Sequence, residues 1–162
     1  MRLLIASLSL VLLAACGFQP MYAPAGGGAI GPVSIAEIEG KAGHVLRTEL
    51  SRMLAVENDG SATPALLEVT LSESVTQQGL RLDESATRAE LRLTANYVLT
   101  PGDARSRPVR GALVTTVNYE IPIAAFGEIT AQDDARERAA ETMAQRLRAE
   151  LALRMAQARP AP

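Results

Sequence analysis

Three stretches of alternating apolar and polar residues constrain the fold of this chain more than any other feature. The first contains Leu67, Val69 and Leu71; the second runs over 91–99 and the third over 109–121, which Pro122 ends. Successive side chains of a strand point to opposite faces, and antiparallel sheets often bury only one face. We therefore predict strands with an apolar face and a polar face. The predicted polar face comprises Glu68, Thr70, Arg92, Thr94, Asn96, Thr116 and Asn118.

Two other stretches have helical spacing. Residues 42–56 place Leu46, Leu50, Met53 and Leu54 on one side of a helix. A second helix is predicted from Thr130 onward, because Thr130 and Asp133 approximate a capping box and no Gly or Pro follows until Pro160. This helix has an apolar row three and four residues apart. The row consists of Ala135, Ala139, Met143, Leu147 and Leu151.

A short first strand is predicted over 33–40, where Val33, Ile35 and Ile38 precede Gly40. The predicted order is then β-α-β-β-β-α. The apolar stripes of two helices and one apolar sheet face must bury each other. We expect an α+β fold, a two-layer sandwich with both helices packed on one face of a four-stranded mixed sheet.

The first 15 residues predict a removable export signal. A single Arg2 precedes an apolar run of about 13 residues, shorter than the ~20 residues that a membrane-spanning helix needs. The run ends in "LAAC" at 13–16, which resembles the lipobox of bacterial lipoproteins. Cys16, the single cysteine, is therefore the predicted lipid attachment site and the first residue of the mature chain. The alternative is an ordinary secretory signal in which the cysteine is accidental.

The next segment predicts a tether and a membrane. Residues 17–32 contain five Gly and three Pro, so 16–32 is expected to be a lipidated flexible tether and 33–162 a single domain. Several acyl chains hold a protein durably at a bilayer. Gly17 stands where an aspartate would favour retention at the inner membrane. We therefore expect a lipid anchor in the outer membrane, on its periplasmic side.

Composition argues against several functions. The chain has one histidine, His44, and its one cysteine is assigned to lipid, so a His/Cys metal site is not expected. His44 has no identifiable aspartate partner for a serine nucleophile, and the acidic pairs Asp83/Glu84 and Asp133/Asp134 suit a turn and a helix start. Without residues 1–15 the formal charge is 15 − 18 = −3, which does not favour nucleic acid. We expect no enzyme activity, no cofactor and no metal.

Four arginines are candidate contacts for an anionic group. Arginine suits bidentate contacts with phosphate or carboxylate. These residues lie in or beside predicted loops at strand ends, so they are candidates for contacting a lipid headgroup or a partner's acidic rim. The alternative is that they only make the loops soluble. The four are Arg81, Arg105, Arg107 and Arg110.

Several segments together resemble the LPS-assembly lipoprotein family LptE. They are "LAACGFQPMY", the strands "LRLTANYVLTP" and "LVTTVNYEIP", and the final "DDARERAAETMAQRLRAELALR". The resemblance implies a non-enzymatic outer-membrane lipoprotein that acts as a plug and assembly partner of the LptD β-barrel and binds lipopolysaccharide. The predicted polar sheet face is compatible with a water-lined barrel lumen. The alternative is an accessory lipoprotein of another periplasmic lipid-transport or cell-wall system.

Overall fold

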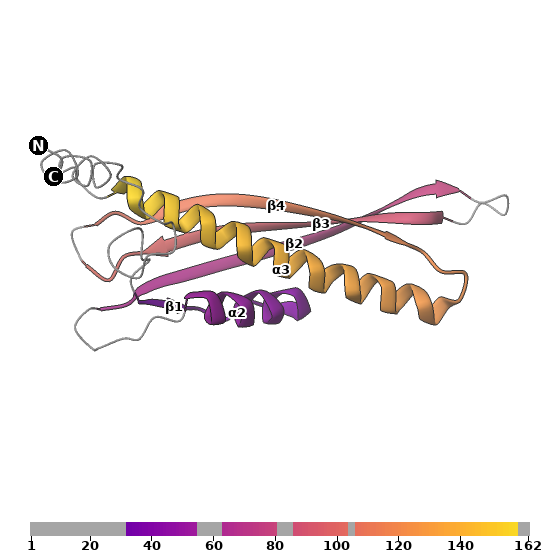
Figure 1. The fold of residues 1–162 in the computed structure, drawn as a ribbon, viewed down its shortest axis with the longest axis horizontal. Coiled ribbons are helices and arrows are strands. Elements are labelled where there is room, and N and C mark those ends of the chain that lie inside the picture. Colours follow the sequence, from indigo (N-terminus) through magenta and orange to yellow (C-terminus); the bar gives the residue numbers. More distant parts are fainter. Residues whose placement is uncertain (1–31, 55–62, 81–85, 104–105, 159–162) are drawn as a thin grey trace, which may run out of the picture.

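The fold is known from a computed structural model that describes residues 32–54, 63–80, 86–103 and 106–158. Four strands form one sheet in the order in which they occur in the chain: β1 (Val33–Ile35), β2 (Ala65–Leu80), β3 (Ala86–Thr100) and β4 (Val109–Glu120). Helices α2 (Gly40–Leu54) and α3 (Ala125–Ala158) complete the domain (Figure 1). The predicted α+β class and the order β-α-β-β-β-α are confirmed.

The sheet is mixed. β1 pairs with β2 in parallel, with Val33 opposite Ala65, whereas β2, β3 and β4 are antiparallel neighbours. The parallel pair follows from the chain passing through α2 between β1 and β2, because parallel strands need a crossover connection. β1 covers only the first residues of β2, so most of β2 lies at the edge of the sheet.

The predicted alternation along the strands is confirmed. One face of β2 and β3 presents buried Leu67, Val69, Leu91, Leu93 and Leu99 to the helices. The predicted polar residues point the other way, and all are exposed except Thr94, which is partly buried. One position differs from a simple apolar row. Thr115 of β4 is only 2% exposed, and its Oγ1 lies 3.8 Å from Met143 Sδ.

Helix α3 crosses the sheet diagonally, as Figure 1 shows. Four of its fully buried residues are alanines, whose small side chains let the helix backbone come close to the strands. Larger buried residues fill the remaining space between helix and sheet. The alanines are Ala135, Ala139, Ala140 and Ala144, and the larger residues are Met143, Leu147 and Leu151.

Element boundaries differ from the prediction in three places. β1 ends at Ile35, so the prediction of a strand over 33–40 was wrong at its end; Ile38 is buried in the connection to α2. Helix α2 covers 40–54 rather than 42–56. Strands β2 and β3 extend to Leu80 and from Ala86, further than their alternating apolar residues indicate.

The predicted start of the last helix at Thr130 was also wrong. Helix α3 begins at Ala125, where the Ala124 carbonyl accepts hydrogen bonds from the amides of Gly127 and Glu128. Thr130 lies inside the helix and its hydroxyl donates to the Phe126 carbonyl, so it does not cap the end. Gly127 fits here because an added Cβ would lie 2.9 Å from Pro122 Cβ. At about 1.5 Å per residue, 34 residues span about 50 Å.

No helix within the described ranges is both long enough and apolar enough to cross a membrane.

We predict that Gly43→Ala destabilises the domain, although Gly to Ala inside an exposed helix normally stabilises it by about 1 kcal/mol. Gly43 is buried in α2, and an added Cβ would lie 2.5 Å from the carbonyl oxygen of Ile38. We expect the free energy of unfolding, measured by urea denaturation, to fall by about 1–3 kcal/mol. The exposed Ser51→Ala in the same helix should change it by about 0.5 kcal/mol or less. An equal effect of the two variants would contradict this account of the α2 packing.

Candidate functional site

The polar face of the sheet is the largest candidate binding surface. Its residues form rows across β2, β3 and β4, one of which is Thr70, Asn96 and Ala112. The next row, Ser72, Thr94 and Val114, is also uncharged. Both described helices pack on the opposite face, so neither covers these rows (Figure 1). Hydroxyl and amide groups on an open surface favour water-mediated contacts over a dry apolar interface.

Charged residues of this face lie toward the ends of the strands. At the end where β2 and β3 are joined, Arg88 is 4.0 Å from Glu120, and Arg92 is 3.5 Å from Glu90. Arg88, Glu120 and Arg92 are exposed whereas Glu90 is partly buried, and pairs near the surface contribute only about 0–1 kcal/mol each. Their side chains can therefore exchange partners when another molecule approaches.

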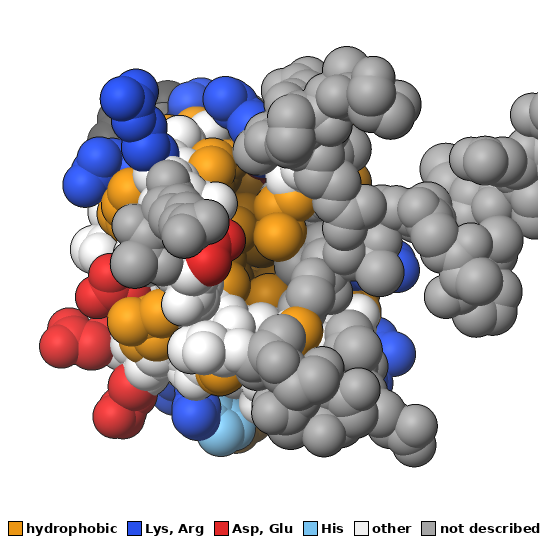
Figure 2. All heavy atoms as spheres, turned by 90° about the vertical axis from the view of Figure 1, so that its left-hand side faces the viewer, with side chains coloured by type: hydrophobic (Ala, Val, Ile, Leu, Met, Phe, Trp, Pro, Cys, Tyr) orange, Lys and Arg blue, Asp and Glu red, His pale blue; other side chains and the backbone are white. Residues whose placement is uncertain are grey.

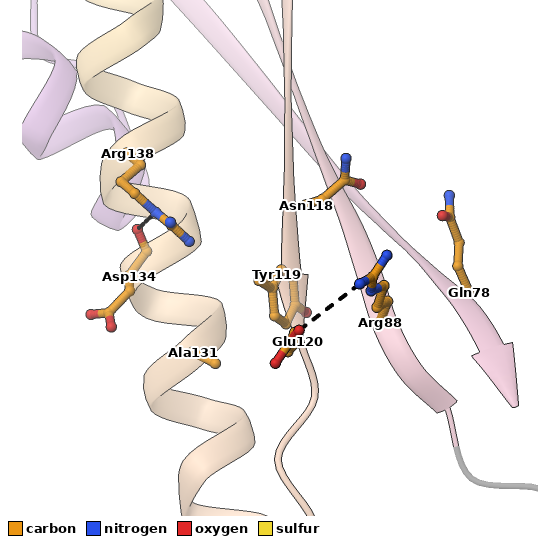
Figure 3. Close-up of a pocket in the computed structure, with 8 residues that line it drawn as sticks. All are labelled: Gln78, Arg88, Asn118, Tyr119, Glu120, Ala131, Asp134 and Arg138. Atoms are coloured by element: carbon orange, nitrogen blue, oxygen red, sulfur yellow. Dashed lines mark hydrogen bonds and ion pairs between the residues drawn. The ribbon is translucent and has the colours of Figure 1, made fainter. Parts of the chain in front are cut away.

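An open cleft of about 570 Å³ lies between this end of the sheet and α3 (Figure 3). Arg138 extends from α3 toward the strands, and Arg88 lies across the cleft beside Glu120. Tyr119 lines the cleft but is 92% buried, and its burial, followed by the charge of Glu128, raises the pKa of its phenol. The phenol is therefore uncharged near neutral pH. The cleft is therefore lined by both positively and negatively charged side chains.

A network of charged side chains connects three elements near the start of α2. The guanidinium of Arg136 on α3 donates from Nε to Glu73 Oε2 at 2.8 Å and from Nη2 to Glu73 Oε1 at 2.7 Å. It also donates to Asp133, whose other oxygen is 3.0 Å from Lys41 Nζ on α2. The Lys41 hydrogen bond, with help from Arg136, holds the pKa of Asp133 below its usual range. The network thus joins β2, α3 and α2.

The structure describes two of the four arginines proposed from the sequence. Arg107 and Arg110 are exposed and make no ion pair with another described residue. Arg81 and Arg105 lie outside the described residues. The connection containing Arg81 follows β2 and precedes β3, whereas Arg105 and Arg107 follow β3 at its other end.

The predicted lipid site, Cys16, also lies outside the described residues and stays a prediction. His44 is exposed on α2, and within the described part of the chain no group of three potential metal ligands comes together. The acidic pair Asp133/Asp134 lies inside α3 rather than at its start.

Sequence reasoning missed an apolar surface at the start of α3. Ile123, Phe126 and Ile129 are 89%, 81% and 62% exposed. Burying a side chain of this size contributes about 1.5–3 kcal/mol. The predicted helix began at Thr130, so these residues were not placed together on a helix. A helix beginning at 125 would have shown Phe126 and Ile129 three residues apart on one side.

The end of the domain where α3 finishes also exposes hydrophobic side chains. Figure 2 looks onto this end, where hydrophobic side chains are visible together with an acidic side chain near the centre, and most Lys and Arg side chains lie at the margin. Leu153 of α3 is 54% exposed.

Comparisons with known proteins define the class. The fold is similar to that of rare lipoprotein B from Shewanella oneidensis, with a TM-score of 0.60 at 12% identity, covering 78% of this chain and 96% of that one. It is also similar to a minor lipoprotein from Acinetobacter baumannii, with a TM-score of 0.51 at 15% identity, covering 78% and 95%. At these identities the likeness concerns the fold alone: a helix-on-sheet domain found in bacterial lipoproteins.

A third structure shows the family. A lipoprotein from Caulobacter crescentus CB15 is 32% identical, with a TM-score of 0.54, and the match covers 83% of this chain and 95% of that one. The chain belongs to the family of this Caulobacter lipoprotein. No protein-family model matches the sequence. No curated protein sequence matches it either.

We predict that Arg136→Ala lowers the free energy of unfolding by about 1–3 kcal/mol, because Glu73 and Asp133 lose charged donors. The Arg136 side chain is only 18% exposed, so in the variant water only partly replaces its hydrogen bonds to the two carboxylates. Urea denaturation at pH 7 measures the effect. Below pH about 4 part of the difference should disappear, because Asp133 stabilises the fold only while ionised and loses that contribution as the pH falls through its lowered pKa.

The matched control is Arg52→Ala in α2. Arg52 pairs with Glu49 three residues away and its side chain is 69% exposed. Because water screens such an exposed pair, this variant should change the free energy of unfolding much less than Arg136→Ala does. If the Arg52 and Arg136 variants lost the same free energy of unfolding, the claim that the Arg136 network stabilises the packing of α3 on β2 and α2 would be wrong.

Proposed function

We propose that this lipoprotein is the LptE-type component of a lipopolysaccharide translocon in the outer membrane. In this role it is non-enzymatic: it occupies the lumen of an LptD-type β-barrel, assists assembly of that barrel, and binds lipopolysaccharide. The single observation that supports the barrel partnership most is the polar sheet face, which neither described helix covers. Membership of a lipoprotein family and the sequence resemblance stated above support the membrane location.

The side chains of the polar face suit a partner surface that is polar and hydrated. The lumen of an outer-membrane barrel is polar. Rows of Thr, Ser and Asn side chains can form direct or water-mediated hydrogen bonds to such a wall without burying uncompensated charge. An apolar partner surface would leave these groups without hydrogen bonds, which costs about 1–3 kcal/mol for each one buried.

The lipopolysaccharide part of the proposal depends on arginine. Arg107 and Arg110 are exposed at the end where β3 and β4 are joined, and guanidinium groups bind phosphate in a bidentate manner. Arg81 and Arg105, which lie outside the described residues, stay candidate contacts from the sequence.

The test is co-expression of the full-length, lipidated chain with a tagged LptD-type barrel from the same organism. We expect the two proteins to co-purify in a 1:1 ratio together with lipopolysaccharide. Failure to co-purify with a folded barrel would overturn the proposal. Stable recovery with a component of another periplasmic lipid-transport or cell-wall system instead would favour the alternative.

The same purification tests the arginines. We expect the combined variant Arg107→Ala, Arg110→Ala to retain the barrel and to carry less lipopolysaccharide. The matched control replaces Arg47 of α2 and Arg148 of α3, two exposed helical arginines, and should not change the lipid. Equal lipid in all three complexes at low and moderate salt would remove Arg107 and Arg110 from the proposal.

A further inference from the structure

Strand β2 has an open edge along most of its length. β1 pairs with β2 only from Ala65 to Leu67, and no other described strand lies on this side (Figure 1). The Ala65 amide and the Leu67 carbonyl form hydrogen bonds on this side, so the odd-numbered residues of β2 direct their backbone groups toward it. We call the stretch Leu71–Gln77 the open β2 edge. Its odd-numbered residues are Leu71, Glu73, Val75 and Gln77.

The open β2 edge lacks the features that usually prevent strands of different molecules from pairing. Edge strands are commonly protected by lysine, proline or a bulge. Residues 69–80 contain no Pro, Lys or Arg, and their one charged side chain, Glu73, accepts two hydrogen bonds from Arg136. A strand added at this edge therefore meets no unpaired charge.

A pocket beside this edge has room for a side chain of an added strand. It has a volume of about 410 Å³ and lies between β2, β3, α3 and the start of α2. Val75, on the same face of β2, is 39% exposed. The edge thus provides both a pocket and an uncovered apolar side chain. The residues that line the pocket include Ala42, Leu71, Leu93, Lys41, Glu73 and Arg136.

We propose that the open β2 edge pairs with the same edge of a second copy of this chain, antiparallel and about a two-fold axis at Ser74. This register places Leu71 opposite Gln77 of the second copy, and Glu73 opposite its Val75. The opposed residues exchange backbone hydrogen bonds, and Val75 of each copy lies at the pocket beside Glu73 of the other. The inference goes beyond the proposed function, because this two-fold pair is a form of the chain that is not bound to the barrel.

The structure disfavours registers with the axis nearer to β1. An axis at Glu73 would place the Glu73 carboxylates of the two copies opposite each other, and like charges in this position are destabilising. An axis at Ser72 would place Gln77 opposite Leu67. The Leu67 carbonyl already accepts a hydrogen bond from the Ala36 amide, so it is not free to pair.

The structure also disfavours a register with the axis further along β2. An axis at Val75 would place Leu71 opposite Gly79, whose φ of 70° is not that of an extended strand. The axis at Ser74 pairs all four odd-numbered residues of the open β2 edge and avoids these conflicts. A two-fold pair needs a self-complementary surface. This edge is self-complementary in that one register, which favours a second copy as the partner.

The first test is the variant Ser74→Cys in the full-length chain, exported to the oxidising periplasm of cells without an added barrel. Residues opposed across the axis would have Cα atoms about 4.5 Å apart, a separation that a disulfide can bridge. Ser74 is exposed, so the variant should fold as the unmodified chain does, which circular dichroism checks. We expect a disulfide-linked dimer of this chain on a non-reducing gel.

The matched control is Ser72→Cys, at an exposed residue on the same face of the same strand. Its two copies would lie about 13 Å apart along the strands, too far for a disulfide. Copies carrying Ser72→Cys should instead link to copies carrying Thr76→Cys, because these positions are opposed in the proposed register. If Ser74→Cys stayed monomeric, linked to another protein, or dimerised no more than Ser72→Cys, the inference would be wrong.

The second test measures the pair without a disulfide, by sedimentation equilibrium of the purified full-length chain in detergent. We expect Val75→Lys to raise the dissociation constant of the pair about tenfold or more, because the pocket would have to take up a charged group. The matched control, Val114→Lys, changes a valine of β4 that is 41% exposed and should leave the dissociation constant unchanged. Equal dimerisation of the Val75 variant and the unmodified chain would overturn the inference.

The outcomes separate this inference from the proposed function. If no pair forms, the inference is wrong and the proposed function stands, because one copy is expected in each barrel. If the pair forms and the chain does not co-purify with the barrel, the proposed function is wrong and the inference stands.

Discussion

Burial of one sheet face beneath α3 is the constraint on which the rest of the structure depends. The strands supply a continuous apolar layer that includes Leu67, Leu91 and Leu99, and the alanines of α3 allow the helix to approach it closely. Because strand side chains alternate, covering one face commits the other to polar residues. The surface proposed for binding is thus a direct consequence of how the core is formed.

Polar contacts then fix the elements around this core. The Arg136 guanidinium joins Glu73 of β2 to Asp133 of its own helix, and Asp133 continues the network to Lys41 of α2. At the opposite edge of the sheet, Arg146 Nη1 donates to the Val114 carbonyl of β4 at 2.9 Å. This hydrogen bond connects α3 to the edge strand β4.

Much of the fold could be predicted from the sequence because its apolar residues follow two clear periods. A period of two predicted β2 to β4, and the row from Ala135 to Leu151 predicted the buried side of α3. Contacts between distant residues could not be predicted. The early start of α3 depends on the Ala124 carbonyl and on Gly127 beside Pro122, and the threonine that suggested a cap bonds inside the helix instead. The cleft depends on how α3 lies against the ends of the strands, and the exposure of Phe126 and Ile129 depends on where α2 begins relative to α3; no local sequence pattern predicts either arrangement.

The functional account depends on the polar sheet face, which suits the water-lined wall of a barrel. The most direct test of the central claim is depletion of this protein in growing cells, followed by measurement of lipopolysaccharide at the cell surface with an impermeant probe. The account predicts that newly made lipopolysaccharide disappears from the surface while its synthesis continues. Unchanged surface lipopolysaccharide after complete depletion would contradict the account.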